Sequence, residues 1–114
     1  MKRISTHVLD TAQGAPGRNL PVRLERQEPS GDWRLIGSAR TDLDGRCGNL
    51  FPEGEAMSGG IYRLTFDTAS YHAAQKVKSL YPLVQITFEL NKGEEQIHIP
   101  LLLSPHGYTT YRGS

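Results

Sequence analysis

The amino-acid sequence predicts an all-β domain, an antiparallel sandwich with one short helix. Apolar and polar residues alternate with a period of two in six segments, the pattern of strands that bury one face. Turn-forming residues separate these segments, and only one stretch has helical character. Short strands at this spacing are typical of antiparallel sandwiches and barrels, and we interpret them as a sandwich.

The alternation places each strand in order along the chain. The expected strands cover residues 4–9, 22–25, 33–35, 62–67, 84–90 and 96–103. Turns are expected between them at residues 14–17, 29–31, 44–45, 59–60 and 91–93, which are rich in Gly, Pro, Asn and Asp. The helix is expected over residues 68–78, where Ala69, Ala73 and Ala74 favour it, and Pro82 stops it.

Two strands carry apolar residues on faces that the alternation assigns to solvent. Leu9 does so in the first strand, and Pro100 and Leu102 do so in the last of the six. An apolar face in such a place is usually covered, and a partner subunit is the simplest cover. We therefore expect His7 and His98 to lie on the outer faces of their strands at a subunit contact.

Length and composition favour one cytoplasmic domain covering residues 1–114. Thirteen basic residues nearly balance twelve acidic ones and form no block, which argues against a nucleic-acid partner. Cys47 is the single cysteine, so no internal disulfide can form and a reducing compartment is expected. No apolar stretch has the length of a signal peptide or a membrane span, so no membrane partner is expected.

Three features are candidates for chemistry. His7 and His98 share the polar side of their strands, and histidine exchanges protons near neutral pH. Arg46 follows an Asp44-Gly45 turn, which would hold a guanidinium ready to grip a carbonyl or oxyanion. The plainer interpretations are two surface histidines and an exposed arginine beside a hairpin turn.

The third feature is the C-terminal segment 104–114, which keeps two tyrosines and an arginine near its end. It suggests a docked terminus, although a final strand that completes the sheet is equally compatible. Cys47 beside Arg46 is a weaker candidate for a nucleophile. The histidines and Cys47 lack the close spacing of zinc ligands, so no metal site is expected.

Four ordered motifs resemble the transthyretin-like proteins almost from end to end. They are Ser5–Thr11, Thr41–Arg46, Tyr62–Thr68 and His98–Pro105. The terminal tetrapeptide Tyr111–Ser114 resembles the signature of the family's enzymatic branch, the 5-hydroxyisourate hydrolases, and is not expected in hormone-carrying transthyretins. The resemblance implies two four-stranded antiparallel sheets with a short helix, and a homotetramer, a dimer of dimers, with its sites in a channel between dimers.

The resemblance also implies the reaction and its residues. The expected activity is cofactor-free hydrolysis of an acyl-nitrogen bond in 5-hydroxyisourate, a small molecule made by urate oxidation. Carried over by motif, the catalytic residues are His7, Arg46, His98 and Ser114, and the substrate-binding residues are His7, Arg46 and Tyr111. Which histidine is the general base stays open at this point. Gln96 stands where many members have a second histidine close to His98.

Two other functions compete with hydrolysis. A non-catalytic small-ligand carrier of the transthyretin type would keep the channel but lack the proton-transferring set, and the presence of that set with Tyr111–Ser114 argues against it. A sandwich module for adhesion or sugar binding would usually be secreted and joined to other domains.

Overall fold

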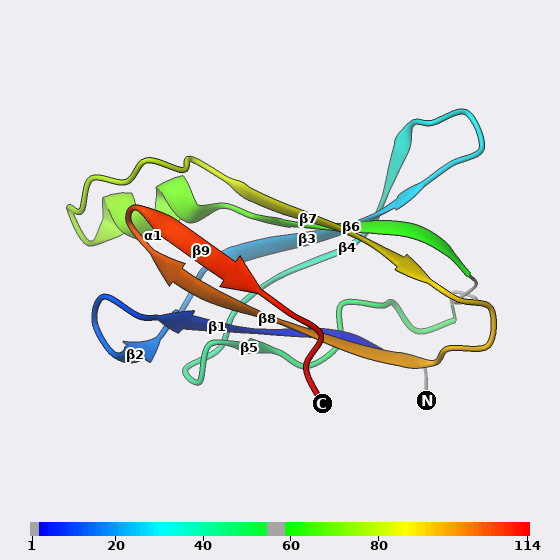
Figure 1. The fold of residues 1–114 in the computed structure, drawn as a ribbon, viewed down its shortest axis with the longest axis horizontal. Coiled ribbons are helices and arrows are strands. Elements are labelled where there is room, and N and C mark those ends of the chain that lie inside the picture. The colour runs from blue at the N-terminus through cyan, green and yellow to red at the C-terminus, as the bar shows by residue number, and fades with distance from the viewer. Residues whose placement is uncertain (1–2, 55–58) are drawn as a thin grey trace.

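The computed structural model describes residues 3–54 and 59–114, which form two β-sheets packed face to face with a short helix at one end (Figure 1). Residues 1–2 and 55–58 of the predicted domain lie outside the described residues. The elements are β1 (Arg3–Asp10), β2 (Ala15–Pro16), β3 (Pro21–Gln27), β4 (Trp33–Arg40), β5 (Arg46–Cys47), β6 (Gly60–Phe66), α1 (Thr68–Ala74), β7 (Val84–Leu90), β8 (Gln96–Ser104) and β9 (Gly107–Thr110).

All six strands expected from the alternation are present, which confirms the sandwich. The C-terminal segment adds β9, so the alternative of a strand that completes the sheet is confirmed for residues 107–110. Strands β2 and β5 were not predicted, because two residues are too few to show an alternation.

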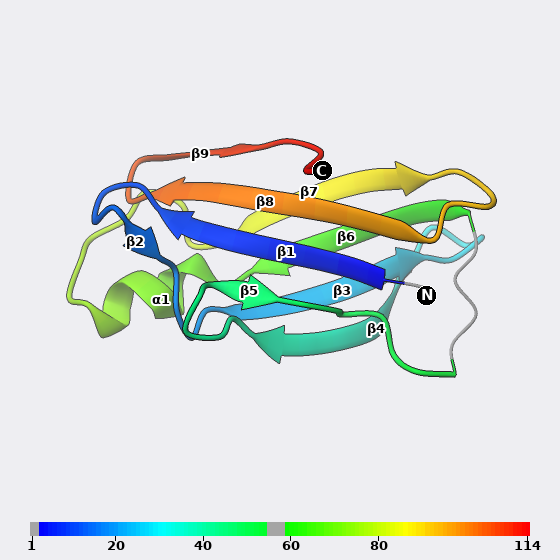
Figure 2. The same ribbon diagram turned by 90° about the horizontal axis from the view of Figure 1, so that it is seen from below.

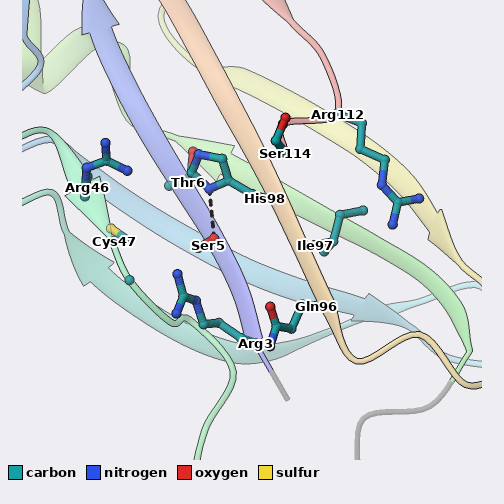
Figure 3. Close-up of a pocket in the computed structure, with 12 residues that line it drawn as sticks. Arg3, Ser5, Thr6, Arg46, Cys47, Gln96, Ile97, His98, Arg112 and Ser114 are labelled. Carbon is teal, nitrogen blue, oxygen red and sulfur yellow. Dashed lines mark hydrogen bonds between the residues drawn. The ribbon is translucent and has the colours of Figure 1, made fainter. Parts of the chain in front are cut away.

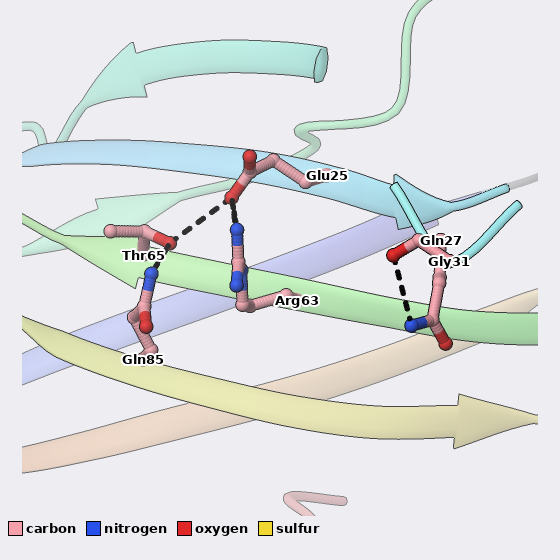
Figure 4. Close-up of polar contacts among 6 residues, drawn as sticks. All are labelled: Glu25, Gln27, Gly31, Arg63, Thr65 and Gln85. Carbon is pink, nitrogen blue, oxygen red and sulfur yellow. Dashed lines mark hydrogen bonds and ion pairs between the residues drawn. The ribbon is translucent and has the colours of Figure 1, made fainter. Parts of the chain in front are cut away.

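One sheet has the order β4-β3-β6-β7 and is antiparallel throughout. Several polar side chains of this sheet pair with one another, as Figure 4 shows. Arg63 forms an ion pair of 3.0 Å with Glu25, and its guanidinium lies 4.2 Å from the ring centre of Trp33. The Thr65 hydroxyl donates to the same carboxylate at 3.3 Å and accepts from Gln85. These contacts satisfy this face without a ligand.

The other sheet has the order β2-β1-β8-β9, and the short β5 pairs with β1 as well (Figure 2). Strand β1 runs parallel to β8, which corrects the prediction of purely antiparallel sheets. The reason is connectivity. All strands of the β4-β3-β6-β7 sheet lie between β1 and β8 in the sequence, so no hairpin joins β1 to β8 and imposes an antiparallel pair.

The core lies between the two sheets and follows the predicted alternation. Ile4, Thr6 and Val8 point inward from β1 and are fully buried. The hydroxyl of Thr6 donates to the Ile99 carbonyl at 2.6 Å, so this buried polar group is satisfied. Tyr62, which is also fully buried, and the alternate apolar residues that follow it in β6 close the core from the other sheet. The opposite face of β1 is thereby left free for other contacts.

Helix α1 ends at Ala74 rather than at Lys78, which corrects the predicted length. The Asp67 carboxylate caps its first turn by accepting from the Ser70 N–H at 3.0 Å. At the other end Lys76 adopts a left-handed conformation with φ 58°. The N–H groups of Lys76 and Val77 then bond the last helical carbonyls, a Schellman closure that stops the helix.

The helix also anchors the end of β1. The Tyr71 hydroxyl donates to the buried Asp10 carboxylate at 2.7 Å, and the N–H groups of Ala12 and Gln13 donate to the same carboxylate. Burial, followed by the bond to Asp10, raises the pKa of Tyr71 to about 12, so the Tyr71 hydroxyl stays protonated and donates at neutral pH.

Within residues 3–54 and 59–114, no helix has the length and apolar character needed to cross a membrane.

Candidate active site

The outer face of the β1–β8 pair gathers the polar residues of both strands. Because side chains alternate along a strand and the two strands run in register, facing residues form cross-strand rows. The rows on this face are Arg3 with Gln96, Ser5 with His98, and His7 with Pro100. Strand β5 then places Arg46 beside His7 on the other edge of β1. Three segments that are distant in the sequence, β1, β5 and β8, therefore share one surface.

A cavity of about 370 Å³ opens on this surface (Figure 3). Its walls come from the start of β1, the β5 segment, the start of β8 and the end of the chain. Among the residues predicted from the sequence, Arg46, His98 and Ser114 line it. His7 and Tyr111 do not line it.

His98 is half-buried on the wall of this cavity. A hydrogen bond of 2.8 Å joins its Nδ1 to the hydroxyl of buried Ser5, the residue facing it across the strands. Burial lowers the pKa of His98, and the positive charges of Arg46, His7 and Arg3 lower it further. The imidazole is thereby held in place and favoured in its neutral form, the state that a general base requires.

Arg46 is presented by a turn whose backbone is fixed, as the sequence predicts. The Asp42 carboxylate accepts from the N–H groups of Asp44 and Arg46, each at 2.9 Å, and these bonds lower the pKa of Asp42. Gly45 has a positive φ of 78°, and a Cβ there would lie 2.4 Å from the Val8 carbonyl oxygen. The guanidinium of Arg46 forms no hydrogen bond or ion pair with any other described residue, so it is available to a ligand.

His7 contacts the same turn. Its Nε2 donates to the Asp44 carbonyl at 2.9 Å, so a hydrogen bond ties its ring to the turn that precedes Arg46. In the described chain His7 therefore supports the arginine and does not itself reach the cavity wall.

The end of the chain is docked over β8. The Gly113 N–H donates to the His98 carbonyl at 2.8 Å, and the Thr110 hydroxyl donates to the Pro100 carbonyl at 2.7 Å. Arg112 forms an ion pair of 2.6 Å with Glu94. The docked segment brings Ser114 to the cavity, whereas Tyr111 is 54% exposed and does not line it.

This docking also corrects one prediction about the apolar outer face. Pro100 is buried in the single chain, and a Cβ built on Gly113 would lie only 3.1 Å from the Cγ of Pro100. The chain's own C-terminal segment therefore covers Pro100, and no partner subunit is needed there.

Gly113 fits only because it has no side chain. A Cβ at this position would lie 2.6 Å from Cδ2 of His98 and 3.1 Å from Cγ of Pro100. We expect Gly113→Ala to displace the C-terminal segment and lower the kcat of the expected hydrolysis about 10- to 100-fold, because small displacements of groups in an active site slow the reaction strongly. Measuring kcat and Tm together tests this, with Gly107→Ala as control, since a Cβ there meets nothing closer than 3.9 Å. An unchanged kcat in Gly113→Ala would show that the close packing of Gly113 on His98 is not needed for activity.

Cys47 lies on the cavity wall but is unsuited to nucleophilic attack. It is buried, and burial followed by the charge of Asp42 raises its pKa to about 11. The thiol therefore stays protonated at neutral pH, and the idea of a thiolate nucleophile was wrong.

In the part of the chain that the structure describes, no three His, Cys, Asp or Glu side chains lie close enough together to hold a metal ion.

Sequence reasoning gave no site role to most of the polar side chains that line this cavity, among them Arg3, Ser5, Gln96 and Arg112. The alternation does place Arg3 and Ser5 on the same face of β1 as His7. It gives no sign that β8 lies beside β1, so the partnership of Ser5 with His98 could not be predicted.

The arrangement as a whole offers a neutral imidazole, a free guanidinium and hydroxyl groups in one hollow. Such a set can deprotonate water and stabilise an oxyanion.

Comparison with known proteins places this chain in a family. A 5-hydroxyisourate hydrolase from Mus musculus is 45% identical over 112 residues, which cover 97% of this chain and 94% of the mouse protein. The solved structure of Klebsiella pneumoniae 5-hydroxyisourate hydrolase superimposes with a TM-score of 0.85 at 32% identity, covering 100% of both chains. Sea bream transthyretin, solved in complex with thyroxine, superimposes with a TM-score of 0.90 at 28% identity, covering 97% of this chain and 94% of that one. The family model described as HIUase/Transthyretin matches residues 4–113, and the chain therefore belongs to the HIUase/Transthyretin family.

Proposed function

We propose that this protein hydrolyses 5-hydroxyisourate to 2-oxo-4-hydroxy-4-carboxy-5-ureidoimidazoline in urate degradation. The observation that carries the proposal is the convergence of His98, Arg46 and Ser114 on one cavity, with the C-terminal segment bonded to the backbone of His98. The activity in the name of the mouse relative agrees with this chemistry. No cofactor enters the proposed reaction.

In the proposed mechanism His98 is the general base. This mechanism requires the tautomer in which Nδ1 donates to the Ser5 hydroxyl, 2.8 Å away, so that Nε2 is unprotonated and can take a proton from water. The hydroxide adds to the acyl carbon of the ring, and Arg46 stabilises the negative charge that forms on the carbonyl oxygen. The carbon–nitrogen bond then breaks, the leaving nitrogen takes the proton back from His98, and the acyl carbon becomes that of a carboxylic acid, which releases its proton to solvent.

The remaining predicted site residues take supporting roles in this proposal. The Ser114 hydroxyl orients the flat ring or the water inside the cavity. His7 keeps the Arg46 turn in place through its bond to Asp44. Tyr111 stays a proposed substrate-binding residue from the family resemblance, and its ring does not reach the cavity of the same copy.

A small-ligand carrier is the second candidate, favoured by the close fold similarity to sea bream transthyretin. The two functions are separated by mixing the protein with freshly prepared 5-hydroxyisourate and following its ultraviolet absorbance. Hydrolysis predicts a decay that accelerates in proportion to protein concentration. A decay no faster than in buffer would favour the carrier.

The pH dependence of the reaction should report the lowered pKa of His98. A base with a lowered pKa stays neutral until the pH falls below that value, so kcat/KM should decline on the acid side only below the ordinary histidine value of 6.5. Since the charge of Arg46 contributes to the lowering, Arg46→Gln should move the acid limb to higher pH. Initial rates measured between pH 5 and pH 8 would give the acid limb of the unmodified protein and that of Arg46→Gln. An acid limb centred above pH 6.5 in the unmodified protein would contradict the assignment of His98 as the base.

We also propose a cytoplasmic homotetramer, a dimer of dimers. The exposed apolar side chains Leu80, Tyr81, Leu83 and Tyr108 support association, because monomers rarely leave such groups in solvent together. Tyr81 and Tyr108 are in edge-to-face contact, with ring centres 5.3 Å apart, so they form one patch. The lone cysteine supports a reducing compartment. Light scattering coupled to gel filtration would test the assembly, and a monomeric mass would reject it.

A further inference from the structure

The cavity extends beyond the residues of the proposed reaction to a second polar end. Figure 3 shows the side chains of Arg3 and Gln96 on the same hollow as His98, below it in that view. The two residues face each other across β1 and β8, one row from the Ser5–His98 pair. Backbone bonds fix this end, since the Arg3 N–H donates to the Glu95 carbonyl at 2.8 Å.

The two side chains offer complementary hydrogen-bonding groups. The carboxamide of Gln96 presents one acceptor and two donor hydrogens, and the guanidinium of Arg3 presents only donors. Neither side chain has a hydrogen bond or ion pair to another residue of the described chain, and no Asp or Glu side chain is among the described residues that line the cavity. This end therefore suits a planar group that carries an N–H beside a carbonyl oxygen with partial or full negative charge.

A cyclic imide edge has this arrangement of groups. We propose that Arg3 and Gln96 form a recognition subsite that binds the imide edge of a flat heterocycle and thereby aims its acyl-nitrogen bond at His98. The inference rests on the proposed function and adds two specificity-determining residues to it. The influence of Arg3 on the pKa of His98 is consistent with both ends sharing one electrostatic environment.

The kinetic test uses Arg3→Gln and Gln96→Glu in the full chain with 5-hydroxyisourate as substrate. Gln96→Glu preserves the shape of the side chain and an acceptor for the imide N–H, but it removes the N–H donors and adds a negative charge that would pair with Arg3 in place of the ligand. Each variant should raise KM about tenfold, the usual effect of losing a hydrogen bond to a charged group, with kcat within about twofold. Both side chains are exposed, so Tm should not change.

Matched controls are Arg23→Gln and Gln85→Glu on the outer face of the other sheet, where both residues are exposed. These variants change the same residue types and the same net charge without touching the cavity, so their KM should stay at the value of the unmodified protein. A rise of KM in the controls equal to that in the cavity variants would overturn the subsite, because long-range charge alone would then explain it.

A binding test separates this inference from the proposed reaction. Urate keeps free imide N–H groups, whereas 1,3-dimethylurate has the same ring system with that edge blocked. Calorimetric titration should show that the unmodified protein binds urate about tenfold more tightly than 1,3-dimethylurate, and that both cavity variants lose this preference.

If the unmodified protein prefers urate yet does not accelerate 5-hydroxyisourate decay, the proposed reaction fails and the subsite stands. If the unmodified protein hydrolyses the substrate but both cavity variants keep their KM and their preference for urate, the subsite is overturned and the reaction stands. Absence of any preference for urate in the unmodified protein would also overturn the subsite.

Discussion

Replacing His98 with asparagine is expected to lower kcat about 10²- to 10⁴-fold, the usual contribution of general acid–base catalysis. His98 is the only histidine among the residues that line the cavity described here, and its Nδ1 is held by Ser5. Asparagine keeps a polar side chain of similar reach but cannot accept and return a proton near neutral pH. The measurement is kcat from the ultraviolet decay of 5-hydroxyisourate at constant protein concentration.

Two further histidine variants make this result specific. His106→Asn alters an exposed histidine in the turn between β8 and β9, and its kcat should equal that of the unmodified protein. His7→Asn should have an intermediate effect, because it removes the bond to Asp44 that supports the Arg46 turn. Near-normal rates in both His7→Asn and His98→Asn would reject the proposed mechanism, and a larger loss in His7→Asn would reassign the base.

Replacing Arg46 with glutamine is expected to lower kcat about 10²- to 10³-fold, as the loss of an oxyanion-stabilising donor does in other enzymes. The guanidinium lines the cavity and forms no ion pair with the described residues, so its charge is available to the transition state. Glutamine preserves one N–H donor but removes the charge and the parallel pair of donors. Single-turnover and steady-state rates would separate a chemical defect from weaker binding.

The Arg46→Lys variant adds a graded comparison. Lysine restores the charge without the planar pair of donors, so its kcat should lie between those of Arg46→Gln and the unmodified protein. Arg23→Gln, on the outer face of the other sheet, controls for the change in net charge. A kcat within about twofold of normal in Arg46→Gln would exclude this residue from oxyanion stabilisation.

The sandwich itself does not distinguish a hydrolase from a carrier. Its inward residues, such as Ile4, Val8 and Tyr62, fill a core that either function would need. The distinction lies on the outer face of β1 and β8, where Ser5 and His98 form a polar pair beside the cavity. Function on this fold therefore depends on a few outward side chains.

Much of this protein could be predicted from the sequence because the decisive signals are local. A period of two identifies strands and assigns Thr6 inward and His7 outward, since each follows from the geometry of one strand. The Asp44-Gly45 turn before Arg46 was predictable for the same reason, because the Asp42 carboxylate bonds N–H groups only two and four residues away. Helix α1 was placed correctly at its start but drawn too long, because the left-handed Lys76 that ends it carries no glycine signal.

Only the tertiary structure decided which outward residues meet. Alternation gives the face of each side chain but not the neighbouring strand, and β1 and β8 lie at opposite ends of the sequence with no turn to fix their register. Their parallel pairing sets Ser5 against His98 and Arg3 against Gln96, and it lets the C-terminal segment seat Gly113 on His98. These contacts depend on core packing summed over both sheets, so no short stretch of sequence encodes them.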